Sequence, residues 1–260
     1  MAAQDETRRL PTYDEIRSDD WTVRRDSFVL LIGTTHVTYG QSGGLPVIPE
    51  LRELIDAEPE TADARIEGLI ELLEIENSVG VDQRRLMFSN DPPYLSPEDR
   101  LPAAYYGYYP ELIWAVSTLN DLRSMNALIG AITTGGMATG ALIAFGIPAV
   151  RPIAELLDHD TANVRSSAVR TLSEMLVDSE AVRSDSESVS IIREAIYRAA
   201  TDQYFTVRMS AVGGLARLGD QESIALIQRI ANKDSFRADF QDNRYVVREL
   251  ARRALEELAE

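Results

Sequence analysis

The chain has 260 residues, 45% of them hydrophobic and 26% charged, so it can bury the core of one large domain or of two ordinary ones. It has no cysteine, which excludes disulfides, thiolate nucleophiles and Cys-ligated metal sites. Its net charge of −16 opposes binding to nucleic-acid phosphates and to anionic lipid, and its two histidines offer little for His-based chemistry. We therefore expect neither a cofactor nor a metal ion.

Residues 1–19 are polar and predict an N-terminal cap or tail. They contain no apolar run of the kind that a secretory signal requires. From this start of the chain we expect a cytoplasmic protein.

Residues 20–33 predict a helix. Val23, Ser27 and Leu31 recur at four-residue spacing, which places them on one face of a helix. Asp20 precedes this run and has the side chain to cap the helix start.

The segment from Gly40 to Gly44 has the letters G-x-S-x-G of a hydrolase nucleophile elbow. That turn works only between a strand and a helix, with a histidine base later in the chain. His159 is the only downstream histidine, and strand patterns are scarce. We expect a loop here and no enzymatic activity.

Acidic residues are concentrated in the first half of the chain, since residues 1–120 carry a net charge of −12. The densest stretch runs from Glu50 to Glu76. One interpretation is a solvated helix face, and the other is a docking patch for a basic partner, which would speed association.

Residues 77–122 interrupt the pattern and predict an irregular, Pro- and Tyr-rich repeat, with helices over 97–106 and 110–122. Their aromatic side chains either pack over neighbouring helices or form a contact surface, because Tyr and Trp carry binding energy at low entropy cost. The candidate partner-binding residues in this segment are Tyr105, Tyr106, Tyr108, Tyr109 and Trp114.

Residues 124–150 carry no charge, and Gly136 and Gly140 have the spacing of a membrane helix-pairing motif. Polar residues near the middle of the stretch, and the lack of aromatic and basic flanks, argue against a membrane span. Two short buried helices, over 124–133 and 136–146, explain the segment better.

Three C-terminal segments share one pattern: Val-Arg, then Ala four residues after the Val, then Leu four residues later. Their valines are 43 and 40 residues apart, which predicts stacked helix pairs. The three copies are Val164-Arg-Ser-Ser-Ala168-Val-Arg-Thr-Leu172, Val207-Arg-Met-Ser-Ala211-Val-Gly-Gly-Leu215 and Val247-Arg-Glu-Leu-Ala251-Arg-Arg-Ala-Leu255.

These copies resemble HEAT repeats, including the PBS lyase HEAT-like variants. The resemblance implies an all-α fold, an α-solenoid of antiparallel helix pairs with about six to seven repeats over residues 20–260. It implies a non-catalytic scaffold or adaptor that holds a protein partner on a curved helical surface. It also implies that the arginines of the Val-Arg pairs bond Asp or carbonyl groups of a neighbouring repeat.

The second helix of each pair lines the concave face in such repeats. Arg170, Arg217 and Arg253 take similar outward places on three of these helices and predict a basic stripe. We expect a protein partner, which is basic if the acidic half of the chain binds it, and no nucleic acid.

Two other functions stay open. One is an enzyme subunit or a chromophore-lyase-like helper, and the other is an acidic inhibitor or immunity protein of a basic enzyme. The oligomeric state is not encoded in any pattern of the sequence.

Overall fold

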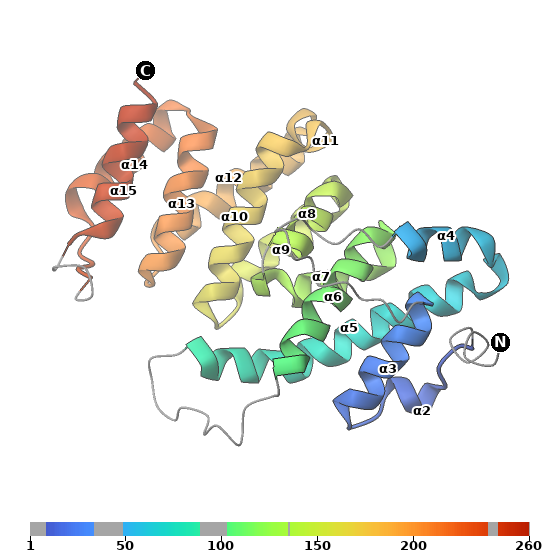
Figure 1. Ribbon diagram of the computed structural model, residues 1–260. Helices are drawn as coiled ribbons and strands as arrows, with labels where there is room; N and C mark the ends of the chain where they lie inside the picture. The colour runs from blue at the N-terminus through green and yellow to red at the C-terminus, as the bar shows by residue number, and fades with distance from the viewer. Residues whose placement is uncertain (1–8, 34–48, 89–102, 135, 239–243, 260) are drawn as a thin grey trace. The chain divides into compact units, whose positions relative to one another are not determined.

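The computed structural model describes residues 9–33, 49–88, 103–134, 136–238 and 244–259 (Figure 1). Side chains are described for these residues except 49–50, 80–88 and 103–107. The regular structure within these ranges is helical, apart from one isolated β-bridge between Ala238 and Arg244. The all-α fold is therefore confirmed. The chain divides into two compact units, Met1–Ala141 (unit 1) and Leu142–Glu260 (unit 2).

Unit 1 is built around one long helix, α5. Helices α3, α6 and α7 pack against α5, and α2 and α4 complete the unit (Figure 1). Leucines of α5 contribute to a core that excludes water almost completely. The helices of this unit are α2 (Tyr13–Ile16), α3 (Trp21–Ile32), α4 (Pro49–Ala57), α5 (Pro59–Phe88), α6 (Ala103–Leu119), η2 (Leu122–Ser124), α7 (Met125–Gly130), η3 (Ile132–Thr134) and α8 (Gly136–Phe145), the last of which reaches into unit 2.

Helix α3 confirms the prediction for residues 20–33. The carboxylate of Asp20 accepts a hydrogen bond from the Thr22 N–H at 2.8 Å, as a helix cap does. The helix ends at Gly33, whose φ of 69° and ψ of 14° place it in the left-handed region.

The prediction of a break before Pro110 is wrong. Helix α6 is continuous from Ala103 to Leu119 and contains Pro110. A proline inside a helix removes one backbone hydrogen bond and costs about 3 kcal/mol. The five apolar residues that follow, Leu112 to Val116, are all buried, and their burial offsets the cost.

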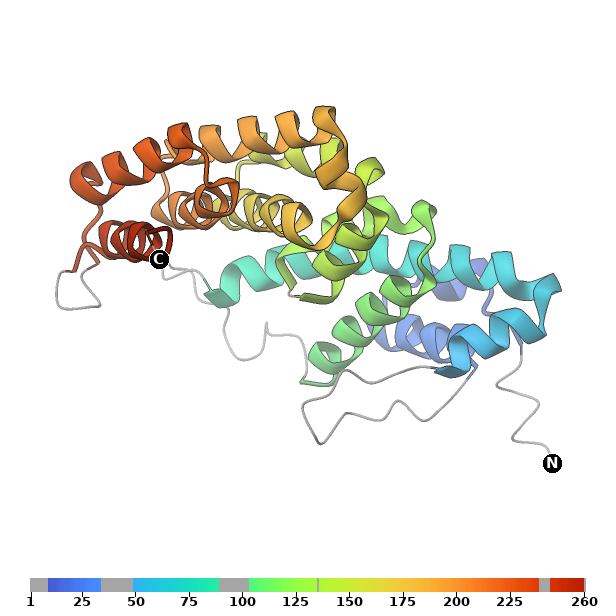
Figure 2. The same cartoon turned by 90° about the horizontal axis from the view of Figure 1, so that it is seen from above.

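Unit 2 consists of helices that pack in adjacent pairs: α9 with α10, α12 with α13, and α14 with α15. Figure 2 shows α10, α13 and α15 side by side in one layer, with α12 and α14 in a second layer. The helices of this unit are α9 (Ile147–Glu155), η4 (Leu156–Asp158), α10 (Ala162–Asp178), α11 (Glu180–Ser184), α12 (Ser186–Ala199), α13 (Phe205–Leu218), α14 (Gln221–Lys233) and α15 (Val246–Glu257).

Helices α10 and α13 run parallel and in register. The hydroxyls of Ser166 and Ser210 lie 2.8 Å apart near the start of both helices. One to two turns later, a Cβ placed on Gly214 would lie 2.5 Å from the Ser173 hydroxyl. Because both contacts advance in the same direction along both helices, equivalent residues of the repeated pattern lie beside one another.

The repeated Ala and Leu positions lie in the interior, except Leu255, which is partly exposed. Ala168 and Leu172 on α10, and Ala211 and Leu215 on α13, are fully buried, as is Ala251 on α15. Small residues at the middle position let the helices approach closely.

Within the described ranges, no helix combines the length and the apolar character needed to cross a bilayer. Residues 124–150 instead contain α7, η3 and α8 and the start of α9. Gly146 has a positive φ of 66° but a ψ of −133°, so it precedes α9 as its N-cap rather than closing α8 in a left-handed turn.

Candidate functional site

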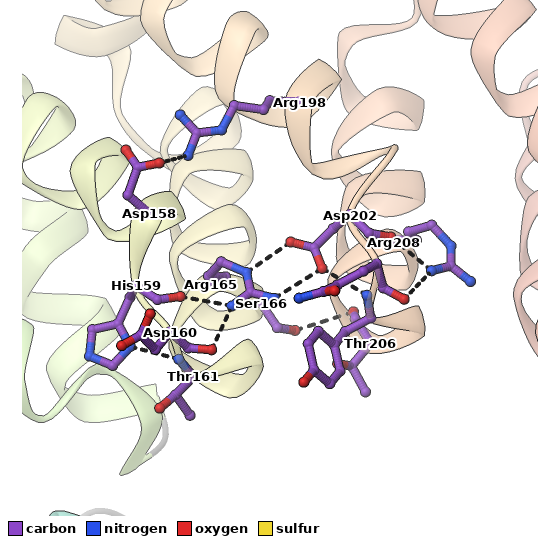
Figure 3. A network of polar contacts seen from close by, with 12 residues as sticks. Asp158, His159, Asp160, Thr161, Arg165, Ser166, Arg198, Asp202, Thr206 and Arg208 are labelled. Carbon is purple, nitrogen blue, oxygen red and sulfur yellow. Dashed lines mark hydrogen bonds and ion pairs between the residues drawn. The ribbon is translucent and has the colours of Figure 1, made fainter.

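The arginine of each Val-Arg pair in unit 2 is held by its neighbours. On α10, Arg165 donates two hydrogen bonds to the Asp202 carboxylate, at 2.8 and 3.0 Å. A further N–H group of Arg165 donates to the carbonyls of His159 and Asp160, at 2.7 and 2.9 Å (Figure 3). Arg165 thus ties the start of its own helix to the segment that precedes α13.

On α13, Arg208 repeats this arrangement. It donates to the Asp234 carboxylate at 2.6 and 3.1 Å and to the carbonyls of Asp202 and Gln203 at 2.8 and 3.0 Å. On α15, Arg248 donates to the carbonyl of Asp234.

Asp202 and Asp234 therefore each join two successive arginines, one through the carboxylate and one through the carbonyl. We call this series from Arg165 to Arg248 the Arg–Asp ladder. It confirms that these arginines bond Asp or carbonyl groups of neighbouring segments.

The charge of Asp202 is stabilised by the ladder. Burial alone would raise the pKa of the Asp202 carboxyl, but hydrogen bonds from Arg165 and from the Tyr204 backbone N–H outweigh it, so the pKa lies below its ordinary value. The Tyr204 ring also lies against Arg165, with the guanidinium carbon 5.3 Å from the ring centroid.

Helices α10 and α13 begin without a side-chain hydrogen bond from their N-cap residues. Helix α10 begins at Ala162 after Thr161, and neither Asp160 nor Asn163 caps it through its side chain. Asp202 lies two residues before Tyr204, the N-cap of α13, and its carboxylate accepts hydrogen bonds both from the Tyr204 N–H, at 2.8 Å, and from Arg165.

The segment Asp158-His159-Asp160 also has structural roles. Asp158 pairs with Arg198 at the surface. The His159 imidazole accepts a hydrogen bond from the Thr161 N–H at 3.0 Å, and the Asp160 carbonyl accepts one from Arg165 (Figure 3).

Three other arginines of the same helices remain exposed: Arg170 on α10, Arg217 on α13 and Arg253 on α15. Among the described residues, no carboxylate lies within ion-pair distance of any of them. Because α13 packs beside both α10 and α15, the three arginines belong to neighbouring helices of one layer. We call this set the arginine stripe.

Two of the three stripe arginines occupy the same position in the repeated pattern. Arg170 and Arg253 each lie six residues after the first valine of their pattern. In α13 that position is Gly213, and Arg217 lies one turn later. The Arg217 guanidinium reaches back by one turn and donates to the Gly213 carbonyl at 3.2 Å.

The aromatic contact surface predicted for unit 1 is corrected at three positions. Tyr108, Tyr109 and Trp114 are 2%, 3% and 7% exposed, so their rings belong to the core. The Tyr109 hydroxyl donates to the Asn77 side chain at 2.6 Å, and the Tyr108 ring lies 5.7 Å from that of Phe28. Helix α6 is buried on most of its circumference, since Leu112 to Val116 are also buried, and these rings are therefore enclosed.

Several sequence candidates lie outside the described residues. They are the segment Gly40–Gly44 and the first residues, 97–102, of the helix predicted over 97–106. The side chains of Tyr105 and Tyr106 are not among those described.

The acidic stretch is largely solvent-exposed, as a charged helix face is. Asp56, Asp63 and Glu67 have side chains 69%, 86% and 70% exposed. Glu76 differs, because it is fully buried and binds Arg24 of α3.

Two residues of the site were not predicted. Asp202 lies six residues before the arginine of the next helix, Arg208, whereas Asp234 lies 14 residues before Arg248. Because these two spacings differ, the sequence does not reveal Asp234 as the equivalent of Asp202. Gly213 was identifiable in principle, because it occupies the position that an arginine takes in the two neighbouring copies.

No family model matches this sequence, and no curated protein matches it. Two solved structures are similar to the chain, and both are described as crystal structures of engineered proteins from the Northeast Structural Genomics Consortium. The first is 14% identical to this chain, with a TM-score of 0.41. The match covers 100% of this chain and 97% of the engineered protein. The second is also 14% identical, with a TM-score of 0.31. The match covers 95% of this chain and 77% of the second engineered protein.

Proposed function

We propose that this protein is a non-catalytic scaffold of HEAT-like repeats that holds a protein partner on the face formed by α10, α13 and α15. In this proposal the arginine stripe contacts acidic groups of the partner. The observation that carries it is the contrast between two sets of arginines on the same three helices. One set is bound by the Arg–Asp ladder, and the other is exposed with no carboxylate in reach among the described residues.

The chemistry of arginine supports this role. A guanidinium has five N–H donors in a rigid plane and binds a carboxylate through two of them. Arginine is also enriched among the residues that dominate binding energy at protein interfaces. An exposed arginine on a rigid helix is therefore well placed to bind an acidic group without reorganising the scaffold.

The HEAT-like assignment rests on the repeated geometry of unit 2. Each copy of the pattern buries its Ala position, and the arginine that follows the Val binds an aspartate or a carbonyl of the neighbouring segment. Stacked repeats leave an extended helical face for a partner.

The acidic face of α4 and α5 supports a second candidate, a basic partner or a basic enzyme that the protein inhibits. Its exposed carboxylates would steer a positively charged protein towards unit 1. This surface is in the other unit, so substitutions separate the two candidates.

The experiment compares two triple variants as baits for proteins of a cell lysate. The test variant, Arg170→Glu with Arg217→Glu and Arg253→Glu, reverses the stripe. The control, Arg151→Glu with Arg193→Glu and Arg229→Glu, makes the same change of charge at exposed arginines of α9, α12 and α14. We expect proteins that bind the wild type and the control but are retained at least tenfold less by the stripe variant.

Retention of the same proteins by all three baits would reject the stripe as the binding face. A variant with Glu53→Lys, Glu60→Lys and Glu74→Lys then tests the acidic face, since these residues are exposed on α4 and α5. Retention of only nucleic acid or small molecules would reject the scaffold function altogether.

A further inference from the structure

The Arg–Asp ladder has an open end at α15. Arg165 and Arg208 each donate two hydrogen bonds to the carboxylate of an aspartate on the following segment, as Figure 3 shows for Arg165. Arg248 donates only from Nε, to the Asp234 carbonyl, and within the described ranges no carboxylate lies at ion-pair distance from it. Solvent reaches its two terminal NH2 groups, which make no hydrogen bond to any described residue. The guanidinium of Arg248 therefore keeps the donors with which an arginine binds a carboxylate.

A second arginine lies on the same face of α15. Arg252 follows Arg248 by four residues, so the two side chains are neighbours on the helix surface. The equivalent residues of the other two copies, Val169 and Val212, are fully buried, whereas Arg252 is exposed. The end of the stack thus presents charge at a position where the inner helices bury an apolar side chain. This end suits a charged ligand better than a further apolar helix pair.

The ladder shows twice what kind of group binds its arginines. The carboxylates of Asp202 and Asp234 each accept a hydrogen bond from the backbone N–H two residues later, at 2.8 and 3.0 Å, which closes a turn around the carboxylate. The donating residue is aromatic in both turns, Tyr204 in the first and Phe236 in the second. The two ligands therefore share the sequence Asp-x-Tyr or Asp-x-Phe.

The aromatic ring of each turn packs on the helix that carries the bound arginine. The Tyr204 ring lies against the Arg165 guanidinium of α10, with 5.3 Å from the guanidinium carbon to the ring centroid. The Phe236 ring stacks on Phe205, the first residue of α13, with centroids 3.8 Å apart and planes at 3°. A turn of this kind thus makes a charged contact and an aromatic contact with the same helix.

The start of α15 offers both of these contacts. Tyr245 lies three residues before Arg248, as Phe205 lies three residues before Arg208. Its ring and the Arg248 side chain are partly exposed, and the Arg248 guanidinium carbon lies 4.1 Å from the ring centroid. This contact holds the Arg248 guanidinium beside the ring.

We infer that Arg248, Arg252 and Tyr245 form a site that binds an Asp-x-Tyr or Asp-x-Phe turn of a protein partner. We call it the end site. The carboxylate of the turn accepts hydrogen bonds from the NH2 groups of Arg248 and is attracted by Arg252, and the aromatic ring of the turn packs at Tyr245. The end site is separate from the arginine stripe, whose member on α15 is Arg253, so it goes beyond the proposed function.

Three capped heptapeptides test the inference on the full-length protein labelled with nitrogen-15. The first has the sequence of residues 200–206, Ala-Thr-Asp-Gln-Tyr-Phe-Thr, which is the turn that binds Arg165. The second has Asn in place of Asp. The third has the order Ala-Thr-Tyr-Gln-Phe-Asp-Thr, with the same composition but no aromatic residue two positions after the aspartate. Binding is followed by NMR through the Nε–H signal of Arg248, which the Arg248→Lys variant identifies.

We expect the first peptide to bind at least threefold more tightly than either of the other two. Arg252→Gln, which leaves every ladder contact in place, should weaken its binding at least threefold. Arg229→Gln, the same change at an exposed arginine of α14, should leave it unaltered. Equal affinity for the three peptides, or equal affinity of the two variants for the first peptide, would overturn the inference.

A further variant tests whether the chain fills the end site with its own carboxylates. Asp239 and Asp242 lie close in sequence to Arg248 but outside the described residues. Unchanged affinity of the Asp239→Asn, Asp242→Asn variant for the first peptide supports a site for a partner. A rise of threefold or more would show that these aspartates occupy the site, and would overturn the inference. Neither result bears on the arginine stripe, which the lysate experiment tests separately.

Discussion

Asp202 and Asp234 each satisfy two arginines that belong to different repeats. A guanidinium with little exposure needs hydrogen-bond partners for most of its donors, because an unsatisfied buried donor costs free energy. The aspartate supplies two kinds of acceptor at one point of the chain. Each of these aspartates therefore links neighbouring helices, and removing its carboxylate should lower the free energy of unfolding.

The first prediction compares two aspartates that differ in burial. Asp202 and Arg165 have side chains 15% and 8% exposed, whereas Asp158, which pairs with Arg198, is 78% exposed. Removing one member of a buried pair strands the other, so Asp202→Ala should lower the free energy of unfolding by about 2–3 kcal/mol. Asp158→Ala should change it by less than about 0.5 kcal/mol. Urea denaturation followed by circular dichroism measures both, and equal effects would contradict a structural role for the ladder.

The second prediction concerns Glu111 on α6. Burial raises the pKa of the Glu111 carboxyl from its ordinary value of 4.5 to about 7. Between these values the folded protein holds a proton that the unfolded chain has released, so this residue lowers stability as the pH rises from 4.5 to 7.

Glu111→Gln should therefore match the wild type in melting temperature at pH 4.5 and exceed it at pH 8. Glu74→Gln, an exposed substitution of the same chemistry on α5, serves as the control. A constant difference between Glu111→Gln and the wild type across this pH range would show that Glu111 does not titrate in this way.

At the scale of the helix, the neighbouring glycines Gly213 and Gly214 of α13 face different surroundings. A Cβ on Gly214 would lie 2.5 Å from the Ser173 hydroxyl and 2.9 Å from the Ile196 side chain, so α13 touches both α10 and α12 there. A Cβ on Gly213 would meet only the end of the flexible Arg217 side chain.

The third prediction is that alanine at these two positions has opposite effects. Alanine favours a helix over glycine by about 1 kcal/mol, so Gly213→Ala should stabilise the protein by up to that amount. Gly214→Ala should destabilise it by about 1–3 kcal/mol, because the methyl group overpacks the contact between the helices. Thermal and urea unfolding of the two variants give the signs directly, and the same sign for both would contradict the close packing of α13.

The helices that could be predicted are those whose pattern reflects their packing. The Val, Ala and Leu stripes of α3, α10, α13 and α15 have helical spacing, and their members are largely buried. Prediction failed where tertiary contacts override a local signal. Pro110 signals a helix break, yet α6 continues through it, and Tyr108 and Trp114 became core residues rather than a contact surface.

The candidate site was predictable to a similar degree. The exposed positions of Arg170, Arg217 and Arg253 follow from helical periodicity. The hydrogen bond from the Arg217 side chain back to the Gly213 carbonyl does not follow from that periodicity. The pairing of Arg208 with Asp234 could not be predicted either, because these residues are 26 positions apart in the sequence.

For the whole molecule, the division into two compact units leads to a fourth prediction. Unit 2 contains the complete Arg–Asp ladder and a core of its own. Residues 142–260 expressed alone should therefore form helices and unfold cooperatively in urea. Asp202→Ala should lower the stability of this fragment by the same amount as that of the full chain. A fragment without a cooperative transition would show that unit 2 depends on unit 1.

The Arg–Asp ladder also bears on how such a protein grows in length during evolution. A duplication of residues 202–233 copies α13 and α14 together with one aspartate and one arginine of the ladder, Asp202 and Arg208. The arginine that formerly met Asp234 then meets the duplicated aspartate, and the new arginine meets Asp234. Every arginine of the ladder still has an aspartate after the insertion. A single tandem duplication therefore lengthens the stack of helices without leaving a buried charge unpaired.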